Sequence, residues 1–208
     1  KHSKIKKGTF IVLFLIGTGA FSQSVISRSW PVSGFESVSI ELPFAEDFQL
    51  SNHTENNVVM SYTSSGEYQD QMRIRSSVTV DVLQLTEFRN PFLNRPNDKL
   101  AAHKVIATQM TLKIPHSLAV FLEMEEGKIQ IQGQYQRLDV LVRSGVCLLD
   151  LTATPGQLKT LSAGVKITHR EMTLSVQSNE KKIDCSIDSD KVLFEVVNLR
   201  GKVDCNPL

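Results

Sequence analysis

Apolar and polar residues alternate along most of this chain, and from Leu118 to Asn206 the alternation repeats about every eighteen to twenty residues. Five reference positions are spaced by 18, 18, 18 and 20 residues, and three of them are glycine. The residues five before, two after and four after each reference position are all apolar. The reference positions are Gly127, Gly145, Ala163, Lys181 and Gly201, and the apolar columns are Leu122-Val140-Leu158-Val176-Val196, Ile129-Cys147-Val165-Ile183-Val203 and Ile131-Leu149-Ile167-Cys185-Cys205.

A unit of this length cannot bury its apolar side alone, so the pattern predicts units that stack and share one continuous core. Each unit would be a strand, a tight corner and a second strand, because glycine accepts the positive φ that such a corner requires. Stacked strands lie about 4.8 Å apart, which brings the residues of one column together. We therefore predict an all-β fold, a β-solenoid with strand-turn-strand rungs of about 18–20 residues.

Two other β folds fit part of this pattern. An antiparallel meander would make the period accidental, and fifteen apolar residues at fifteen inward positions argue against it. A left-handed hexapeptide β-helix would need about three six-residue repeats in each coil. The third hexad is not visible here, so this fold ranks second.

The segment 35–115 has the period-two pattern of strands but not the regular repeat. Val38, Ile40, Leu42 and Phe44 alternate with polar residues, which predicts a half-buried strand that Pro43 interrupts. Further strands are predicted after it, up to Pro115. No stretch has the sustained apolar spacing of an amphipathic helix.

Three segments are predicted to lie outside the strands. Residues 23–34 are expected to be a leader with turn residues, and residues 67–72 a single helical turn. Residues 86–100 contain two prolines and three asparagines and have no periodicity. They are predicted to be a loop, or an insertion at one edge.

The first 22 residues are typical of a secretory signal peptide. Four lysines precede the apolar run from Phe10 to Ile16, which is too short to span a bilayer, and Ala20-Phe21-Ser22 favours cleavage before Gln23. An uncleaved anchor is the alternative. We expect an exported protein, periplasmic or at the cell surface, in which residues 23–208 form a single domain with N-terminal strands at 35–115 and regular repeats at 118–206.

The charge of the chain bears on its partners. Without the four lysines of the signal segment, 19 basic and 22 acidic residues remain. A nucleic-acid-binding protein would show a basic surface, and no later segment is long and apolar enough to span a membrane. We therefore expect neither a nucleic-acid partner nor a membrane span after cleavage.

The positions three residues after each reference position are predicted to face outward, and they hold polar, apolar and charged residues. Asp184 and Asp204 would be stacked neighbours about 5 Å apart, with Lys166 next to them. Clustered acids of this kind occur in glycosidases, and two carboxylates also suit a weak cation site that still lacks ligands. Solvated charges on a strand face are the simpler interpretation, which we favour.

Histidines and cysteines complete the candidate chemistry. No histidine has a partner at metal-ligand spacing, so His53, His103, His116 and His169 are interpreted as surface residues, and we predict no metal, cofactor or catalytic residue. Cys185 and Cys205 fall in one inward column of successive rungs. Their Cβ separation across a rung would be slightly longer than the disulfide mean of about 3.8 Å, so buried free thiols are favoured over a bridge.

Several segments resemble the bacterial "putative adhesin" family, the auto-transporter adhesin head domain. They are VSGFESVSIELPF (Val32 to Phe44), MTLKIPHSLAVFLEMEEGKIQIQG (Met110 to Gly133), RSGVCLLDL (Arg143 to Leu151) and SAGVKIT (Ser162 to Thr168). The similarity covers about residues 30–206. The chain departs from the family in its single corner glycines and in Lys181, where glycine is missing. The resemblance implies a right-handed, single-stranded β-helix-like solenoid, an address outside the cytoplasm, a role in adhesion, and no catalytic residues.

These observations favour a non-enzymatic exported protein that presents its solenoid surface to an unknown protein or glycan of the cell envelope. A carbohydrate-active enzyme of the β-helix type is the first alternative, through Lys166, Asp184 and Asp204. A structural or assembly factor of the envelope is the second.

Overall fold

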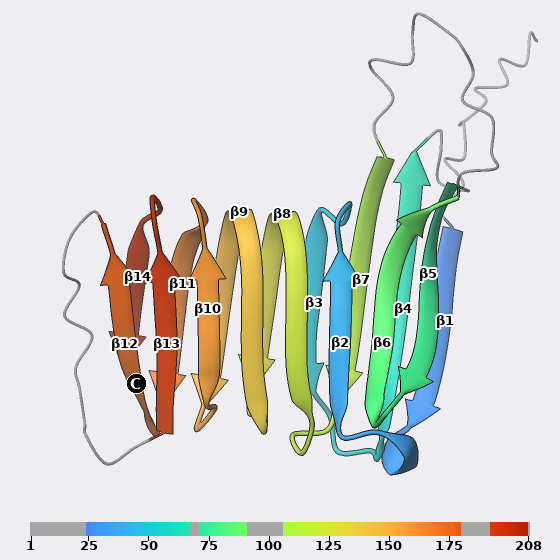
Figure 1. Cartoon of the computed structure of the whole chain (residues 1–208), viewed down its shortest axis with the longest axis horizontal. Coiled ribbons are helices and arrows are strands. Elements are labelled where there is room, and N and C mark those ends of the chain that lie inside the picture. Colours follow the sequence, from blue (N-terminus) through green and yellow to red (C-terminus); the bar gives the residue numbers. More distant parts are fainter. Residues whose placement is uncertain (1–23, 67–70, 91–105, 180–191, 208) are drawn as a thin grey trace, which may run out of the picture.

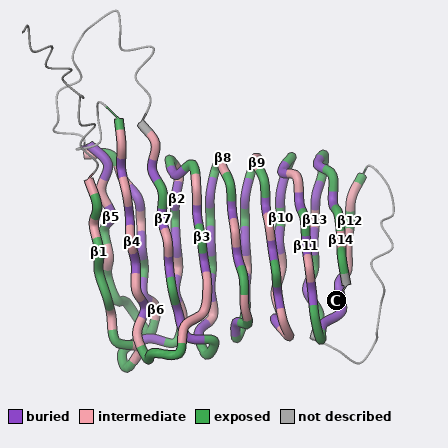
Figure 2. The backbone as a smooth tube through the Cα atoms, turned by 180° about the vertical axis from the view of Figure 1, so that it is seen from behind, coloured by how far each residue is buried: buried purple, intermediate pink, exposed green. Residues whose placement is uncertain are grey.

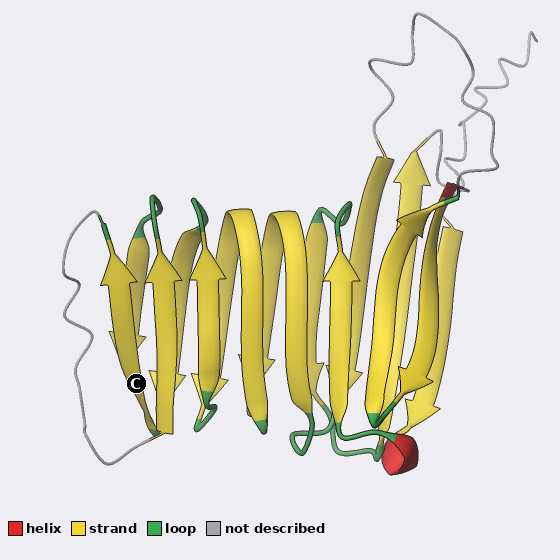
Figure 3. Cartoon of the chain, viewed as in Figure 1, coloured by secondary structure: helices red, strands yellow, loops and turns green. Residues whose placement is uncertain are grey.

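The computed structural model describes residues 24–66, 71–90, 106–179 and 192–207, which form an all-β structure with one 3-10 turn, η1 (Val32–Gly34) (Figure 1, Figure 3). No helix in these residues is long and apolar enough to cross a membrane. The strands are β1 (Ser24–Pro31), β2 (Ser37–Leu42), β3 (Asp47–Asn52), β4 (Asn57–Gly66), β5 (Met72–Thr79), β6 (Val82–Arg89), β7 (Ile106–Ile114), β8 (Ala119–Gly133), β9 (Arg137–Thr152), β10 (Gly156–Thr160), β11 (Gly164–Arg170), β12 (Met172–Ser178), β13 (Val192–Asn198) and β14 (Val203–Pro207).

The strands lie in two facing layers, and the long strands β8 and β9 pass from one layer to the other (Figure 1). The front layer has the spatial order β5, β6, β2, β8, β9, β10, β13 and β12. The back layer has the order β1, β4, β7, β3, β8, β9, β11 and β14. Pairs in the stack are parallel, whereas β1–β4, β4–β7 and β5–β6 at one end are antiparallel.

Glycine makes the corners at which β8 and β9 change layer. Gly127 and Gly145 have φ of +145° and +118°, a region that residues with a Cβ rarely adopt. They are direct partners in the parallel register, and a Cβ added to Gly145 would overlap the carbonyl oxygen of Gly127. The predicted stacking of corner on corner is confirmed at these two positions.

The three predicted apolar columns face the space between the layers. All thirteen of their described members are buried or packed against the core, and the exposed residues alternate with them along each strand (Figure 2). Ile183 and Cys185 lie outside the described residues. Burial of these side chains provides the main driving force for the stack.

The predicted order of the rungs is wrong at the C-terminal end. Val203 pairs directly with Val165, and Cys205 with Ile167, so β14 is the neighbour of β11. In the front layer β13 lies between β10 and β12, with Val196 between Leu158 and Val176. The apolar pattern cannot distinguish the predicted order of the strands from the observed order, because both orders place apolar residues side by side in every column.

Three predictions for the N-terminal half are corrected. Residues 24–31 of the expected leader form strand β1, antiparallel to β4, and Arg28 Nη1 donates to Ser76 Oγ of β5 at 3.0 Å across the end of the stack. Strand β6 continues to Arg89, inside the predicted 86–100 loop, and positions 91–100 lie outside the described residues. Phe44 is 50% exposed, because the chain turns after Leu42 and buries Ala45 instead. Most of the helical turn predicted at 67–72 also lies outside the described residues.

The two described cysteines differ, because one is a free thiol and the other is in a disulfide. Cys147 is a free thiol in the core, and burial raises its pKa to about 12. Cys205 is disulfide-bonded, so the free thiol that we favoured at this position is not what the structure has. Cys185 lies outside the described residues, and its pairing with Cys205 stays a prediction.

Candidate functional site

The sequence pointed to Lys166 and Asp204, and the structure places both on the outer surface of the back layer. They are direct register partners on β11 and β14. Asp204 Oδ2 accepts a hydrogen bond from Lys202 Nζ at 3.0 Å, and both side chains are exposed, so the ion pair adds little stability. Asp184 lies outside the described residues. The predicted order Lys166-Asp184-Asp204 is wrong in that Asp204 stands next to Lys166.

Lys166 belongs to a row of outward side chains that crosses the back layer at right angles to the strands. The register connects Thr111, Gln49, Gln130, Leu148 and Lys166 on β7, β3, β8, β9 and β11. Neighbours in the row lie about 4.8 Å apart.

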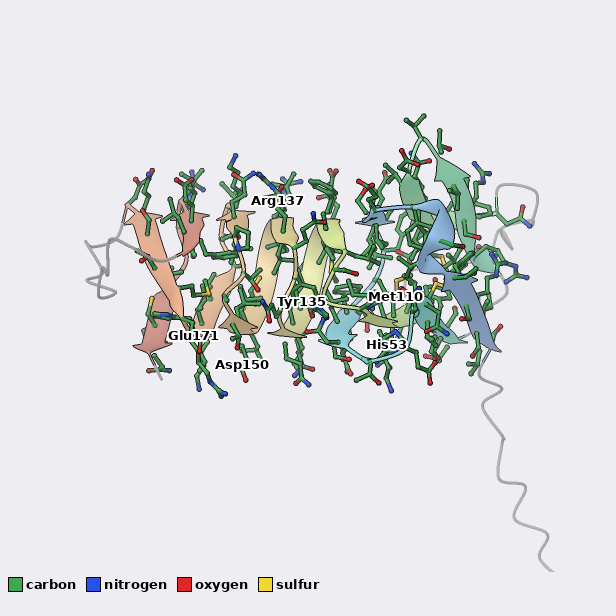
Figure 4. All side chains as sticks on the ribbon, turned by 90° about the horizontal axis from the view of Figure 1, so that it is seen from below. His53, Met110, Tyr135, Arg137, Asp150 and Glu171 are labelled. Atoms are coloured by element: carbon green, nitrogen blue, oxygen red, sulfur yellow. The ribbon has the colours of Figure 1, made fainter. Side chains whose placement is uncertain are left out.

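A second row runs beside the first, two residues further along each strand. It contains Lys113, Ser51, Gln132, Asp150 and Thr168. The two rows line a shallow depression of about 450 Å³. Figure 4 shows Asp150 on this outer side and Arg137 on the opposite side of the molecule.

The end of β8 is held firmly beneath the second row. Tyr135 lies inside the molecule and is buried (Figure 4). It donates its hydroxyl proton to the carbonyl of Gln132 at 2.7 Å. Asn52 Oδ1 accepts from the backbone N–H of Gln134 at 2.6 Å, and Gly133 packs directly on Asn52. These contacts fix the backbone that carries Gln132, so its amide is presented from a rigid edge.

Amides and hydroxyls dominate the chemistry of the depression. Three glutamines, two threonines and one serine supply both donors and acceptors. The charged residues on its lining are Lys113, Lys166 and Asp150, so Asp150 is the one carboxylate among the described lining residues. The surface therefore matches a ligand with many hydroxyl or amide groups and little charge.

The described part of the chain holds no group of three or more His, Cys, Asp or Glu residues that could bind a metal ion. Of the predicted surface histidines, His116 is exposed, and His53 is half-buried with Nε2 2.6 Å from the carbonyl of Asn57. His169 is 4% exposed, so that prediction is wrong, because it lies on the inward side of β11. His103 lies outside the described residues.

Sequence reasoning missed Gln49, Ser51, Thr111 and Lys113, which are four of the ten residues in the two rows. They come from β3 and β7, which precede the regular repeat. A signal was present, since Asp47-Phe48-Gln49-Leu50 and Lys128-Ile129-Gln130-Ile131 share the same alternation with glutamine between two apolar residues. These two segments are register partners.

No protein-family model and no curated protein matches the sequence. A solved structure titled a "putative cell adhesion protein" from Clostridium sporogenes matches with a TM-score of 0.53 and 10% identity, over 90% of this chain and 100% of that chain. A "putative adhesin" from Bacteroides fragilis matches over 90% and 98% of the two chains, at 11% identity and a TM-score of 0.34. A "putative lipid binding protein" from Parabacteroides distasonis matches over 88% and 96%, at 9% identity and a TM-score of 0.28.

The first of these likenesses shows that the chain shares the fold of the structure from Clostridium sporogenes. The resemblance that the sequence motifs indicated is therefore confirmed at the level of the fold.

Proposed function

We propose that this chain is a non-enzymatic, exported binding protein of the β-solenoid class, and that the outer surface of its back layer binds a carbohydrate chain of the cell envelope. The stacked strand-corner-strand units and the fold likeness to an adhesin-type structure support this class. A right-handed, single-stranded β-helix is the geometry that we propose for the stack. The apolar segment before Gln23 supports export.

The observation that carries the proposal is the pair of polar rows on β7, β3, β8, β9 and β11. Sugar hydroxyls both donate and accept, as do the amides of Gln49, Gln130 and Gln132. The rows repeat about every 4.8 Å across five strands, so the surface offers a long series of similar contacts. A linear glycan uses such a series well, since many weak contacts add up along its length.

The carbohydrate-active enzyme is the competing proposal for the same surface. Hydrolysis usually requires two carboxyl groups about 5–9.5 Å apart, one of them as a general acid. Among the described residues Asp150 is the one carboxylate of the depression, and Asp204 is two strands and two residues away from it in the register. The experiment below therefore includes a readout of turnover.

Calorimetric titration of the mature chain with a panel of neutral, acidic and amino-sugar oligosaccharides tests the proposal. We expect saturable binding of at least one class, weakened by Gln130→Ala and Gln132→Ala. Gln84→Ala, which removes an exposed glutamine from the front layer, serves as the matched control and should leave affinity unchanged. Loss of binding in the control, or binding to no oligosaccharide, would contradict the proposal, and new reducing ends would favour the enzyme.

A further inference from the structure

The outer surface of the front layer carries exposed apolar side chains that the proposed glycan site does not use. Phe121 and Leu141 are 41% and 49% exposed, and both border a depression of about 350 Å³. Phe121 also borders a second hollow of about 560 Å³ beside the turn between β5 and β6. Ligand sites are generally concave and lined by hydrophobic and aromatic side chains together with a few polar groups.

Carboxylates lie on two sides of the Phe121 side chain, and Ser39 of β2 is its register partner on a third side. Asp139 on β9 is the direct register partner of Phe121, and Glu123 follows Phe121 by two residues on the same side of β8. Glu41 on β2 is the register partner of Glu123, and both side chains are exposed. Register partners lie about 4.8 Å apart, so two negative charges stand side by side next to the ring.

The charge of this surface is unbalanced. Five acidic residues but only two basic ones, Arg137 and Lys159, line the two hollows. Arg137 is already engaged, because its Nε donates to Asp139 Oδ2 at 2.7 Å and this contact raises the pKa of Arg137. Asp139 Oδ1 is buried and has no hydrogen-bond partner among the described residues. The exposed carboxylates of Glu41 and Glu123 therefore give this surface an excess of negative charge for a cationic partner.

We propose that this front surface binds an extended polypeptide segment of a partner protein in which arginine alternates with aliphatic residues. A guanidinium group stacks on an aromatic face and donates in parallel to carboxylate oxygens, and Phe121 with Glu41 and Glu123 supplies both kinds of contact. In an extended segment every second side chain lies on one face, about 6.6 Å apart, which matches the two-residue spacing of Phe121 and Glu123 on β8. The aliphatic side chains of the segment then lie on its other face, and Leu141 contacts the methylene groups of the arginine side chains.

Fluorescence anisotropy with a labelled peptide, four arginines alternating with three leucines, tests the proposal on the mature chain. A peptide with glutamine in place of each arginine is the ligand control. The double variant Glu41→Gln/Glu123→Gln removes two charges from the front surface. Glu55→Gln/Glu171→Gln removes the same charge from exposed positions elsewhere and is its matched control. Phe121→Ala tests the ring, and as an exposed residue it leaves no core cavity.

The proposal predicts saturable binding of the arginine peptide and none of the glutamine peptide. Glu41→Gln/Glu123→Gln should weaken binding about ten-fold and Phe121→Ala about five-fold, whereas the control pair should change it less than about two-fold. Equal weakening by the two double variants would mean general charge attraction and would overturn the proposal. Failure to saturate would overturn it as well. Neither result bears on oligosaccharide binding at the back layer, which uses other residues.

Discussion

Tyr62 on the back layer donates its hydroxyl proton to Glu87 on the front layer at 2.8 Å, and both side chains are fully enclosed by the protein. Glu87 Oε1 also accepts from Thr108 Oγ1 at 2.8 Å, and Glu87 Oε2 accepts from the backbone N–H of Phe44 at 2.8 Å. Burial, and then the negative charge of Glu87, raise the pKa of Tyr62 well above its usual range. The carboxylate thus joins the two layers and fixes the corner between β2 and β3, where no glycine is present.

We expect Glu87→Gln to destabilise the fold by about 1–3 kcal/mol, since an amide nitrogen cannot accept from Phe44 or Tyr62 and one donor is left buried without a partner. Urea unfolding measures the change. Glu55→Gln, at an exposed position, should alter stability by less than about 0.5 kcal/mol. Equal changes in the free energy of unfolding for the two variants would show that the buried hydrogen bonds of Glu87 do not stabilise the fold.

Gly145→Ala should destabilise the stack by at least about 2 kcal/mol, because the new Cβ would overlap the Gly127 carbonyl oxygen at a φ of +118°. Gly34→Ala is the control, since nothing lies within 4 Å of a Cβ at that position. Thermal unfolding followed by circular dichroism compares the two. A Gly145→Ala variant as stable as the parent would contradict the stacked-corner geometry.

Thiol counting by intact mass tests the cysteines. We expect no alkylation of the folded chain, because Cys147 is buried and its raised pKa keeps the thiol protonated. In urea without reductant one thiol should react, and with reductant all three. Three alkylated thiols in urea without reductant would exclude a bridge between Cys185 and Cys205.

Stability should decrease in alkaline solution. The thiol of Cys147 loses its proton near its ordinary pKa of 9.0 in the unfolded chain, but only at about 12 in the folded chain. Between these values the unfolded state binds fewer protons, so the free energy of unfolding falls by up to about 1.4 kcal/mol per pH unit from this group. Urea unfolding from pH 8 to 11 should give a shallower fall for Cys147→Ala than for the parent. Identical slopes would contradict a proton retained on the buried thiol.

The sequence pattern predicted the columns and the glycine corners because apolar residues and glycine recur at fixed positions in each eighteen-residue repeat. It could not predict that Val203 adjoins Val165, since both possible orders bury aliphatic residues. Strand β1 was missed because an edge strand rich in serine lacks a strong apolar alternation. Of the candidate site, Lys166 was found in the regular repeat, next to Asp204, whereas Gln49 and Thr111 come from strands outside its period.

Chemical-shift mapping of the labelled chain from Gln23 onward, with the tightest-binding oligosaccharide of the panel, tests the central claim most directly. The account predicts that the perturbed amides cluster at the outward positions of β3, β7, β8, β9 and β11, around Gln49, Gln130 and Gln132. Shifts confined to the front layer around Phe121, or to the open ends of the stack, would contradict it.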